Sequence, residues 1–518
     1  MIWQPEIEEL EKRKHLAEQM GGQEGIEKQH SRGKLTVRER IDALADPGSF
    51  QEIGVLTGSA RYEDDKLVGF TPANSVAGLC TLNGRKVAFS GGDFTVRGGA
   101  SDAAVGNKGG YAQRLALEWH LPFIRLLDAT GGSVRTFEQI GRTYIPDANP
   151  GCAITAQLLR TAPVISAALG SVAGLPAVEA CMAHFNLMVK GTSQVFAGGP
   201  PVVKAALGYD VTKEELGDER TQIYDSGVID NLAETEEEAF EMIRRFLSYM
   251  PQNVWEMPPR AEPTDDANRR EEELLSIIPR KRTRSYDPYR ILKLVLDHDS
   301  FFEIAPFYGK SRVTGLARVN GYPVGVMINN PMQLGGSMDV AAGSKVIRFI
   351  QLCDLFHVPM VYFADEPGFM VGIEAQKQGI VRAGARIVLA TINTKMPWIT
   401  FIIRQLFGVA GQLHNRPGGM YKRVGWPSGH WGSMHIEGGA RAAYRREIEN
   451  APDPEAKQQE IERMLQAISS PFRTAEAFNI EDIIDPRDTR PILCDFIETA
   501  QGMIKTQLGP SYGPSWNP

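Results

Sequence analysis

The chain has 518 residues, is 42% hydrophobic and 23% charged, and carries a formal net charge of −7. It is too long for one hydrophobic core, so at least two domains are predicted, and its composition is typical of a soluble globular protein. The negative charge argues against a general nucleic-acid-binding role. Five scattered cysteines without a CxxC pair predict a reducing compartment with mostly buried thiols, and no disulfide framework or zinc site. The sequence shows no apolar leader and no run of about 18 apolar residues, so we predict a cytoplasmic protein with no membrane span.

The first 50 residues are predicted to form a helical arm. The sequence TVRE at Thr36–Glu39 has the spacing of a capping box, which marks the start of a helix.

An internal repeat follows this arm. GGASDAAVGNK at Gly98–Lys108 returns as GGSMDVAAGSK at Gly335–Lys345, and the surrounding residues match without a gap. Asp128 in the first copy corresponds to Asp365 in the second. A repeat this long excludes a solenoid and predicts two similar domains rather than one large fold with coincidental glycines.

Each copy predicts the same succession of elements. Short apolar runs follow an Asn-Gly turn, segments 101–120 and 338–357 have helical spacing, and residues 122–129 and 359–366 are near-continuous apolar runs typical of buried strands. Residues 163–169 and 397–403 predict one further strand in each copy. This alternation of strands and helices predicts an α/β fold.

A proline-rich, charged stretch at residues 257–273 separates the two copies and is predicted to be a solvated linker. We therefore predict an N-terminal domain at residues 1–258, which includes the arm 1–50, and a C-terminal domain at residues 259–518.

The common catalytic motifs are absent from the sequence. It has no Walker A loop, no GxSxG nucleophile elbow, no HExxH motif and no histidines at metal-ligand spacing. What remains is one glycine-containing turn after a buried strand in each copy, GSVAGLPA at 170–177 and FGVAGQLH at 407–414. Such turns can point backbone N–H groups at a developing oxyanion, although strand–turn glycines often serve structure alone.

Several blocks resemble the carboxyltransferase (β) subunits of biotin-dependent acyl-CoA carboxylases, of the propionyl-CoA carboxylase β type, and the related decarboxylase α chains. They include KQHSRGKLTVRERID at 28–42, DEPGFMVGIEAQKQGIVRAGARI at 365–387, EGGARAAYRREI at 437–448 and IIDPRDTRPIL at 483–493. These blocks occur in the family's order and together span nearly the whole chain.

The resemblance implies two tandem crotonase-like domains of the ClpP/crotonase superfamily and a homo-hexamer. It implies an active site between the N-terminal domain of one subunit, which takes acyl-CoA, and the C-terminal domain of its neighbour, which takes carboxybiotin. The chain has no biotinylation site and no ATP-grasp-like region, so a biotin carboxylase and a biotin carboxyl carrier protein are expected as partners, with no metal on this chain.

Residue roles follow from the same resemblance. Carried over by position, the N–H groups of Gly174 and Leu175 would hold the thioester oxygen, and those of Val409 and Ala410 the biotin oxygen. Further residues would contact the substrates: Gly131, Gly132, Arg135, Gly408, Gly411 and Gln412.

The sequence departs from the family inside both turns. The second glycine of each turn is replaced, by Leu175 and by Val409, and a β-branched valine predicts ordinary backbone dihedrals there. Gly411 stands where the family usually has tyrosine, next to Gln412 at a position linked to acyl-chain choice. A bulkier or more polar acyl group than propionyl is expected unless Leu413 or Met420 fills the space.

Three alternatives to a carboxylase subunit stay open. The chain could be the α chain of a biotin-dependent decarboxylase, or a non-catalytic assembly subunit of a carboxylase. It could also be a biotin-free crotonase-type enzyme, for which Glu179 is the one acidic candidate.

Overall fold

The computed structural model describes residues 2–106, 108–145, 150–414 and 418–510, which form two compact units. Unit 1 comprises residues up to Glu256 together with Gly509 and Pro510, and unit 2 comprises residues 257–508. The division between the units lies close to the predicted domain boundary. No helix in the described ranges has both the length and the hydropathy needed to cross a bilayer.

Unit 1 is built on a sheet in the order β1-β4-β5-β6-β7-β8-β10, with β9 paired to β7. The β1–β4 and β4–β5 pairs are antiparallel and all other pairs of this sheet are parallel, while β2 and β3 form a separate hairpin. The strands are β1 (Gln51–Glu52), β2 (Gly58–Glu63), β3 (Lys66–Pro72), β4 (Ser75–Leu82), β5 (Arg85–Gly92), β6 (Phe123–Ala129), β7 (Val164–Ala173), β8 (Phe185–Val189), β9 (Gln194–Phe196) and β10 (Asn231–Ala233).

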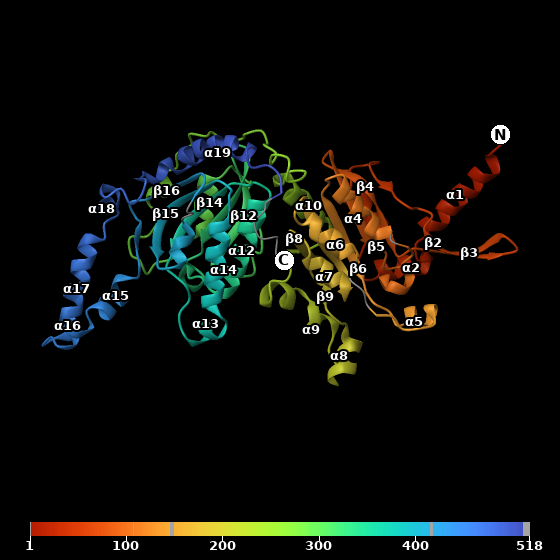
Figure 1. The fold of residues 1–518 in the computed structure, drawn as a ribbon, viewed down its shortest axis with the longest axis horizontal. Helices are drawn as coiled ribbons and strands as arrows, with labels where there is room; N and C mark the ends of the chain where they lie inside the picture. Colours follow the sequence, from red (N-terminus) through yellow and green to blue (C-terminus); the bar gives the residue numbers. More distant parts are fainter. Residues whose placement is uncertain (1, 107, 146–149, 415–417, 511–518) are drawn as a thin grey trace. The chain divides into compact units, whose positions relative to one another are not determined.

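Helices cover both faces of this sheet (Figure 1). Helices α3 and α10 pack together against strands β4 and β8, whereas α4 packs on β4 and β5 and also contacts α6. The helices of unit 1 are α1 (Gln4–Glu18), α2 (Gly22–His30), α3 (Val37–Leu44), α4 (Lys108–Glu118), α5 (Arg135–Ile140), α6 (Pro150–Leu158), α7 (Leu175–Cys181), α8 (Pro200–Leu207), α9 (Lys213–Gly217) and α10 (Glu236–Tyr249).

Unit 2 repeats this topology. Its sheet runs β11-β12-β13-β14-β15-β16-β18, with β17 paired to β15, and again only the first two pairs are antiparallel. The strands are β11 (Phe302–Glu303), β12 (Arg312–Val319), β13 (Tyr322–Asn329), β14 (Met360–Glu366), β15 (Trp398–Phe407), β16 (Tyr421–Gly425), β17 (His430–Gly432) and β18 (Asp482–Ile483).

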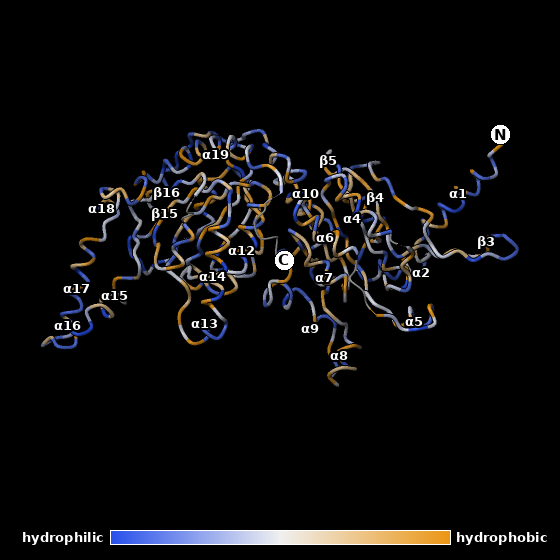
Figure 2. The backbone as a smooth tube through the Cα atoms, in the orientation of Figure 1, coloured by the Kyte–Doolittle hydropathy of each residue, from blue (hydrophilic) through white to orange (hydrophobic). Residues whose placement is uncertain are grey.

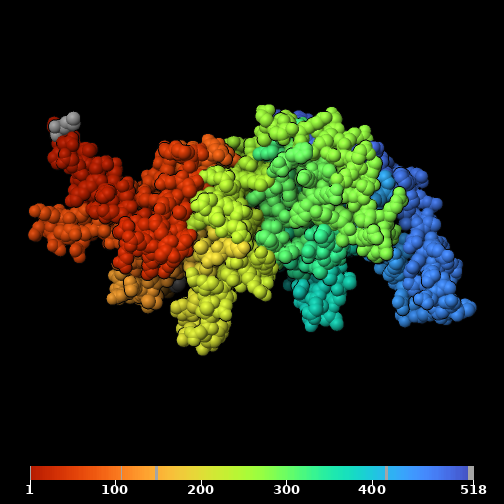
Figure 3. Space-filling model, turned by 180° about the vertical axis from the view of Figure 1, so that it is seen from behind, coloured from red at the N-terminus to blue at the C-terminus, as the bar shows by residue number. Residues whose placement is uncertain are grey.

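The main core of unit 2 lies between this sheet and helices α11 and α19, while α12 packs on the opposite face. Figure 2 shows hydrophobic residues along the strands. The helices are α11 (Pro288–Val295), α12 (Val340–Leu355), α13 (Ile373–Lys377), α14 (Ile380–Asn393), α15 (Ile436–Ala443), α16 (Arg445–Glu449), α17 (Pro454–Ile468), α18 (Pro471–Glu476) and α19 (Thr489–Lys505). Within unit 2, the α13 segment protrudes beyond the sheet (Figures 1 and 3).

The structure confirms the predicted repeat of elements. Both Asn-Gly pairs form the turns of β-hairpins, and all four residues have positive φ (Asn83 50°, Gly84 77°, Asn320 49°, Gly321 80°). The predicted buried strands correspond to β6, β7, β14 and β15. The α/β prediction is therefore correct for both units.

One predicted helix is shorter than expected. The segment 338–357 contains α12 almost throughout, but in segment 101–120 the helix α4 begins only at Lys108, and Asn107 lies outside the described residues. The carboxylate of Asp339 caps α12 by accepting a hydrogen bond from the Ala342 N–H at 2.8 Å. The equivalent Asp102 pairs instead with Arg97 at 3.0 Å, so the same sequence position does not start a helix there.

The remaining local predictions are also confirmed. The arm is helical, and Thr36 and Glu39 form both hydrogen bonds of the capping box. Of the predicted linker 257–273, residues 257–271 contain no helix or strand, whereas Glu272 and Glu273 already belong to a 3-10 helix (Glu272–Leu275). All five cysteines are free thiols, and three of them are buried.

Candidate active site

The first turn joins β7 to α7 at Gly174. Its dihedrals, φ 66° and ψ −131°, lie in a region that is practically restricted to glycine. The Gly174 N–H donates a hydrogen bond to the carbonyl of Phe196 in β9, at 3.3 Å. This amide, a predicted oxyanion donor, is thus engaged within the fold, and the glycine shapes the turn.

Leu175 carries the next amide, at the first position of α7. No hydrogen bond among the described residues uses this N–H, and the following residue, Pro176, has none to offer. The N–H groups of Ala177 and Val178 return to the Gly174 carbonyl at 3.1 and 3.2 Å. The first turn therefore presents a single available backbone donor, that of Leu175.

The loop after β6 lies against this turn. A Cβ atom on Gly131, which has a φ of 76°, would stand only 2.6 Å from the carbonyl oxygen of Ala173 and 3.6 Å from the Cα of Gly174. Gly132 next to it faces open space, and the exposed Arg135 begins α5. The fold thus brings Gly131 beside Gly174, and Gly132 and Arg135 continue from it along the surface.

The second turn, after β15 in unit 2, has the same construction. Gly408 has a φ of 64°, and its N–H donates to the carbonyl of Gly432 at 3.1 Å. The amides of Val409 and Ala410 have no acceptor among the described residues. Val409 and Leu175 both avoid positive φ, which confirms the prediction of ordinary dihedrals at the substituted positions.

The two turns differ in how many donors they offer. Gly408 matches Gly174, Val409 matches Leu175, and Ala410 stands where the first turn has Pro176. Because proline lacks an N–H, the second turn can present two adjacent amides and the first only one.

A buried carboxylate anchors the strand before each glycine loop. Asp128 accepts hydrogen bonds from Gln29 at 2.9 Å, Lys34 at 2.8 Å and Arg40 at 3.1 Å. Burial lowers the pKa of Lys34, although Asp128 opposes this effect. Asp365, its counterpart, accepts one hydrogen bond from Tyr286 at 2.9 Å and pairs with Arg404 at 2.9 Å.

Asp128 and Asp365 occupy matching positions of the repeat, but the sequence alone predicts no role for either carboxylate. Their invariance between the two copies was the signal that could have identified them, because the lysine and arginine partners lie far away in the sequence.

A small pocket lies beside the second turn. Its volume is about 200 Å³, and Gly408, Gly411 and Gln412 all line it, together with Leu406 and Arg423. The atoms nearest to a Cβ built on Gly411 belong to Leu406, at 3.4 Å, and not to Leu413 or Met420. Leu406 therefore occupies the direction in which a side chain at Gly411 would point, and the open space is the pocket beside it.

His414 links the second turn to strand β16. It hydrogen-bonds to the Gly411 carbonyl through Nδ1, and its Nε2 lies 3.1 Å from a guanidinium nitrogen of Arg423. Burial, with the Arg423 charge as a smaller cause, lowers the pKa of His414 to about 4. A neutral imidazole accordingly ties strand β16 to the residues that follow Val409 and Ala410, a connection that the sequence did not predict.

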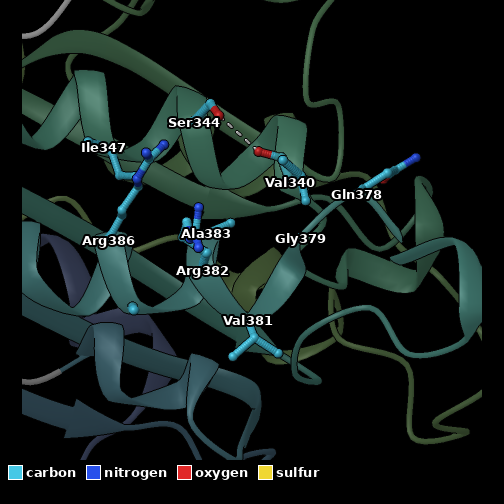
Figure 4. Close-up of a pocket in the computed structure, with 10 residues that line it drawn as sticks. Val340, Ser344, Ile347, Gln378, Gly379, Val381, Arg382, Ala383 and Arg386 are labelled. Carbon is cyan, nitrogen blue, oxygen red and sulfur yellow. Dashed lines mark hydrogen bonds between the residues drawn. The ribbon is translucent and has the colours of Figure 1, made fainter. Parts of the chain in front are cut away.

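A larger groove of about 690 Å³ runs between α12 and α14 (Figure 4). Ser344 and Ile347 line one side, and Arg382 and Arg386, one helical turn apart, line the other. None of the ion pairs found among the described residues involves either arginine. The groove thus adds positive charge to the face formed by α12 and α14.

Glu179 on α7 is the one acidic candidate of the first unit. Burial raises the pKa of its carboxyl, while the neighbouring Arg125 acts in the opposite direction. The group lies on the helix that starts at Leu175.

Comparison with known proteins agrees with this architecture. The family model described as "Carboxyl transferase domain" matches residues 28–505. The carboxyltransferase subunit of propionyl-CoA carboxylase from Haloferax mediterranei is 33% identical over 99% of both chains. The 12S subunit of methylmalonyl-CoA carboxyltransferase from Propionibacterium freudenreichii is 32% identical over 98% of this chain and 96% of its own.

The α subunit of methylmalonyl-CoA decarboxylase from Veillonella parvula is also related, with 30% identity over 94% of each chain. Among solved structures, hexameric transcarboxylase 12S with methylmalonyl-coenzyme A matches with a TM-score of 0.86 and 29% identity, over 99% of this chain and 97% of its own. The match confirms the tandem crotonase-like fold. With matched turns in both units and similarity along its whole length, the chain belongs to the carboxyl transferase domain family, that of the carboxyltransferase subunits of biotin-dependent acyl-CoA carboxylases.

Proposed function

We propose that this chain transfers CO2 from carboxybiotin to the α-carbon of an acyl-CoA, and that its backbone amides are the catalytic groups. The observation that carries the proposal is the pair of equivalent turns. Each follows the equivalent strand of its unit and is shaped by a glycine of positive φ. The first turn presents one backbone N–H, and the second presents two, without an acceptor among the described residues.

The chemistry demands little from side chains. Carboxybiotin, brought by a carrier protein, supplies CO2 and, after releasing it, the base that takes the α-proton of the thioester. The Leu175 N–H holds the thioester oxygen as negative charge develops on it in the enolate, and the enolate carbon forms the new bond to CO2. The amides of Val409 and Ala410 hold the ureido oxygen. Preorganised donors of this kind contribute about 2.7–4 kcal/mol each in other enzymes.

This division assigns one substrate to each domain. Residues 1–258 take the acyl-CoA, with Gly131, Gly132 and Arg135 along the CoA path, and residues 259–518 take the carboxybiotin. Both turns serve one reaction, so we propose a homo-hexamer, the assembly named for the related 12S structure, that works with separate biotin carboxylase and carrier subunits.

The pocket beside Gly411 supports an acyl group larger or more polar than propionyl. About 200 Å³ is open there, and the exposed Gln412 offers both a hydrogen-bond donor and an acceptor. A screen of CoA thioesters with the complete carboxylase complex, read as kcat/KM, identifies the preferred acyl group.

The variant Leu175→Pro tests the catalytic role of the first turn. Proline suits the first helical position, and α8 already begins with Pro200 and Pro201, so the substitution removes the N–H and little else. We expect kcat for carboxyl transfer to fall roughly 10²–10³-fold.

Leu175→Ala is the matched control, since it changes the side chain and keeps the amide. Wild-type turnover in a folded Leu175→Pro variant would remove this amide from the mechanism. Loss of turnover in both variants would point to the leucine side chain instead.

A decarboxylase α chain is the second candidate, favoured by the Veillonella relative. The purified complex should be offered free carboxybiotin with an acyl-CoA, and separately a malonyl-type thioester with biotin. If the complex decarboxylates the malonyl-type thioester faster than it carboxylates the acyl-CoA, and does so together with a membrane partner, the chain is a decarboxylase α chain. No exchange in either mixture, with carrier binding intact, would select the assembly subunit.

A further inference from the structure

The pairing of β6 with β7 is interrupted just before the first turn. The two strands pair before and after Asp128, but at this point Asp128 alone in β6 stands opposite three residues of β7, 169–171. A β-bulge of this kind bends the strand and changes the direction of the residues that follow it, and such bulges recur beside active sites. Strand β7 then continues directly into the turn at Gly174.

Arg40, in helix α3 of the N-terminal arm, joins the two sides of this bulge. Its Nη1 donates to the Asp128 carboxylate at 3.1 Å, and its Nη2 donates to the carbonyl of Leu169 at 2.7 Å. The same guanidinium donates two further hydrogen bonds, both of 2.8 Å, to the carboxylate of Glu236 in α10. Arg40 is only 1% exposed, so β6, β7 and α10 hold this buried side chain in one position.

Unit 2 has the same bulge with a cation from another source. Asp365 in β14 stands opposite residues 403–405 of β15. The Nε of Arg404, from within the bulge itself, donates to Asp365 at 3.0 Å, and the Gln405 N–H donates to the same carboxylate at 3.1 Å. Gly170 stands at the matching position of unit 1 and has no side chain, so the arm supplies the guanidinium there. An arginine–aspartate pair that is built in two ways at the same bulge indicates a requirement common to both turns.

We propose that Arg40 is a positioning residue for carboxyl transfer, which holds the bulge of β7 against Asp128 and thereby fixes the direction of the Leu175 N–H. Asp128 acts on the turn from its own strand as well, because β6 leads to Gly131, where a Cβ atom would stand 2.6 Å from the Ala173 carbonyl oxygen. The inference rests on the proposed role of the Leu175 amide. A misplacement of about 1 Å at a reacting centre can cost roughly 100-fold in rate.

The variant Arg40→Lys tests this role. Lysine keeps the positive charge, but its compact ammonium cannot reproduce the planar set of bonds to Asp128, Leu169 and Glu236. We expect kcat of the complete carboxylase complex to fall about 10–100-fold, with KM for the acyl-CoA changed less than about twofold, because Arg40 is buried and acts through the amide. Wild-type kcat in a folded Arg40→Lys variant would overturn the proposal.

Combining Arg40→Lys with Leu175→Pro separates positioning from a purely structural role. If Arg40 acts through the Leu175 amide, Arg40→Lys should lower kcat by less than about twofold once that amide is gone. A full additional loss in the double variant would contradict the proposal. Wild-type turnover of Leu175→Pro alone would instead remove the amide from the reaction, which distinguishes a failure of the proposed function from a failure of this inference.

Arg490→Lys in α19 is the matched control. Arg490 is also 1% exposed, donates to the Asp297 carboxylate at 2.8 Å, and donates to the backbone carbonyls of Asp266 and Val295. None of these bonds reaches a glycine turn, so this variant should lower the thermal midpoint and leave kcat within about twofold of wild type. An equal loss of kcat in both lysine variants would assign the effect to general destabilisation and overturn the proposal.

Glu236→Gln serves as the test if Arg40→Lys does not fold. Glutamine keeps the size of the side chain and removes the charge that holds Arg40 from the α10 side. We expect a smaller fall in kcat, of about 3–10-fold, again with little change in KM. Wild-type kcat in this variant would equally contradict the positioning role.

Discussion

Gly170 in β7 shows how a single missing side chain supports the active-site turn. A Cβ atom at this position would stand 2.1 Å from an oxygen of Asp128, the carboxylate that Lys34 and Arg40 hold in place. Gly170→Ala must displace that carboxylate and leave buried cations without their partner. We expect a loss of about 3–5 kcal/mol in the free energy of unfolding, measured by urea denaturation.

Gly109→Ala is the matched control for this substitution. Gly109 lies in α4 with no heavy atom within 4 Å of a built Cβ, so alanine there should leave stability unchanged or raise it by about 0.5–1 kcal/mol. Equal effects of the two substitutions would mean that the Asp128 contact does not stabilise the fold.

His414 predicts a pH dependence of stability at the second turn. Its pKa is about 4 in the folded protein, below its ordinary value of 6.5, so unfolding takes up a proton between these two values. The contribution of neutral His414 to the free energy of unfolding is therefore complete above pH 6.5. It falls by up to about 3 kcal/mol as the pH is lowered towards 4.

The variant His414→Asn, which cannot titrate, isolates this effect from that of the carboxylates. The difference in unfolding free energy between wild type and variant should shrink as the pH is lowered from 7 to 4. A difference that does not change with pH would show that the imidazole is not the responsible group.

At the level of elements, equivalent aspartates make different contacts in the two units. Asp339 caps α12, whereas Asp102 pairs with Arg97 and its helix starts later. Asp339→Ala should therefore lower the free energy of unfolding by about 1 kcal/mol, measured as a shift of the thermal midpoint.

Asp339→Ser is the control, because serine retains a capping oxygen and should recover most of the loss. If serine does not recover it, the effect comes from the lost charge.

At the level of the whole molecule, exposed apolar side chains gather at residues 371–381 of unit 2, which comprise α13 and the start of α14. Val371, Ile373 and Val381 are 84%, 74% and 72% exposed, which is unusual for a chain that stays monomeric. We expect light scattering to give the mass of six copies of the 57.1 kDa chain, and Val371→Asp with Ile373→Asp to lower it. Met503→Glu, at an isolated and 40% exposed residue of α19, is the control. A double variant with unchanged mass would exclude this segment from the assembly contacts.

Much of the architecture was predictable because it depends on local patterns. The Asn-Gly turns, the apolar strands β6, β7, β14 and β15, and the capping box at Thr36 all follow from the order of neighbouring residues. The internal repeat predicted two domains, and together with the family blocks it predicted where in each domain the glycine turn lies.

The sequence by itself thus determined the duplicated α/β fold, the family and the segments that carry the reaction. Only the tertiary structure decided which atoms are available there: the Gly174 amide donates to the Phe196 carbonyl, whereas the Leu175 amide has no acceptor among the described residues. The physical reason is that strands and turns obey nearest-neighbour preferences, whereas hydrogen-bond partners and cavities depend on the approach of strands and helices that are distant in the chain.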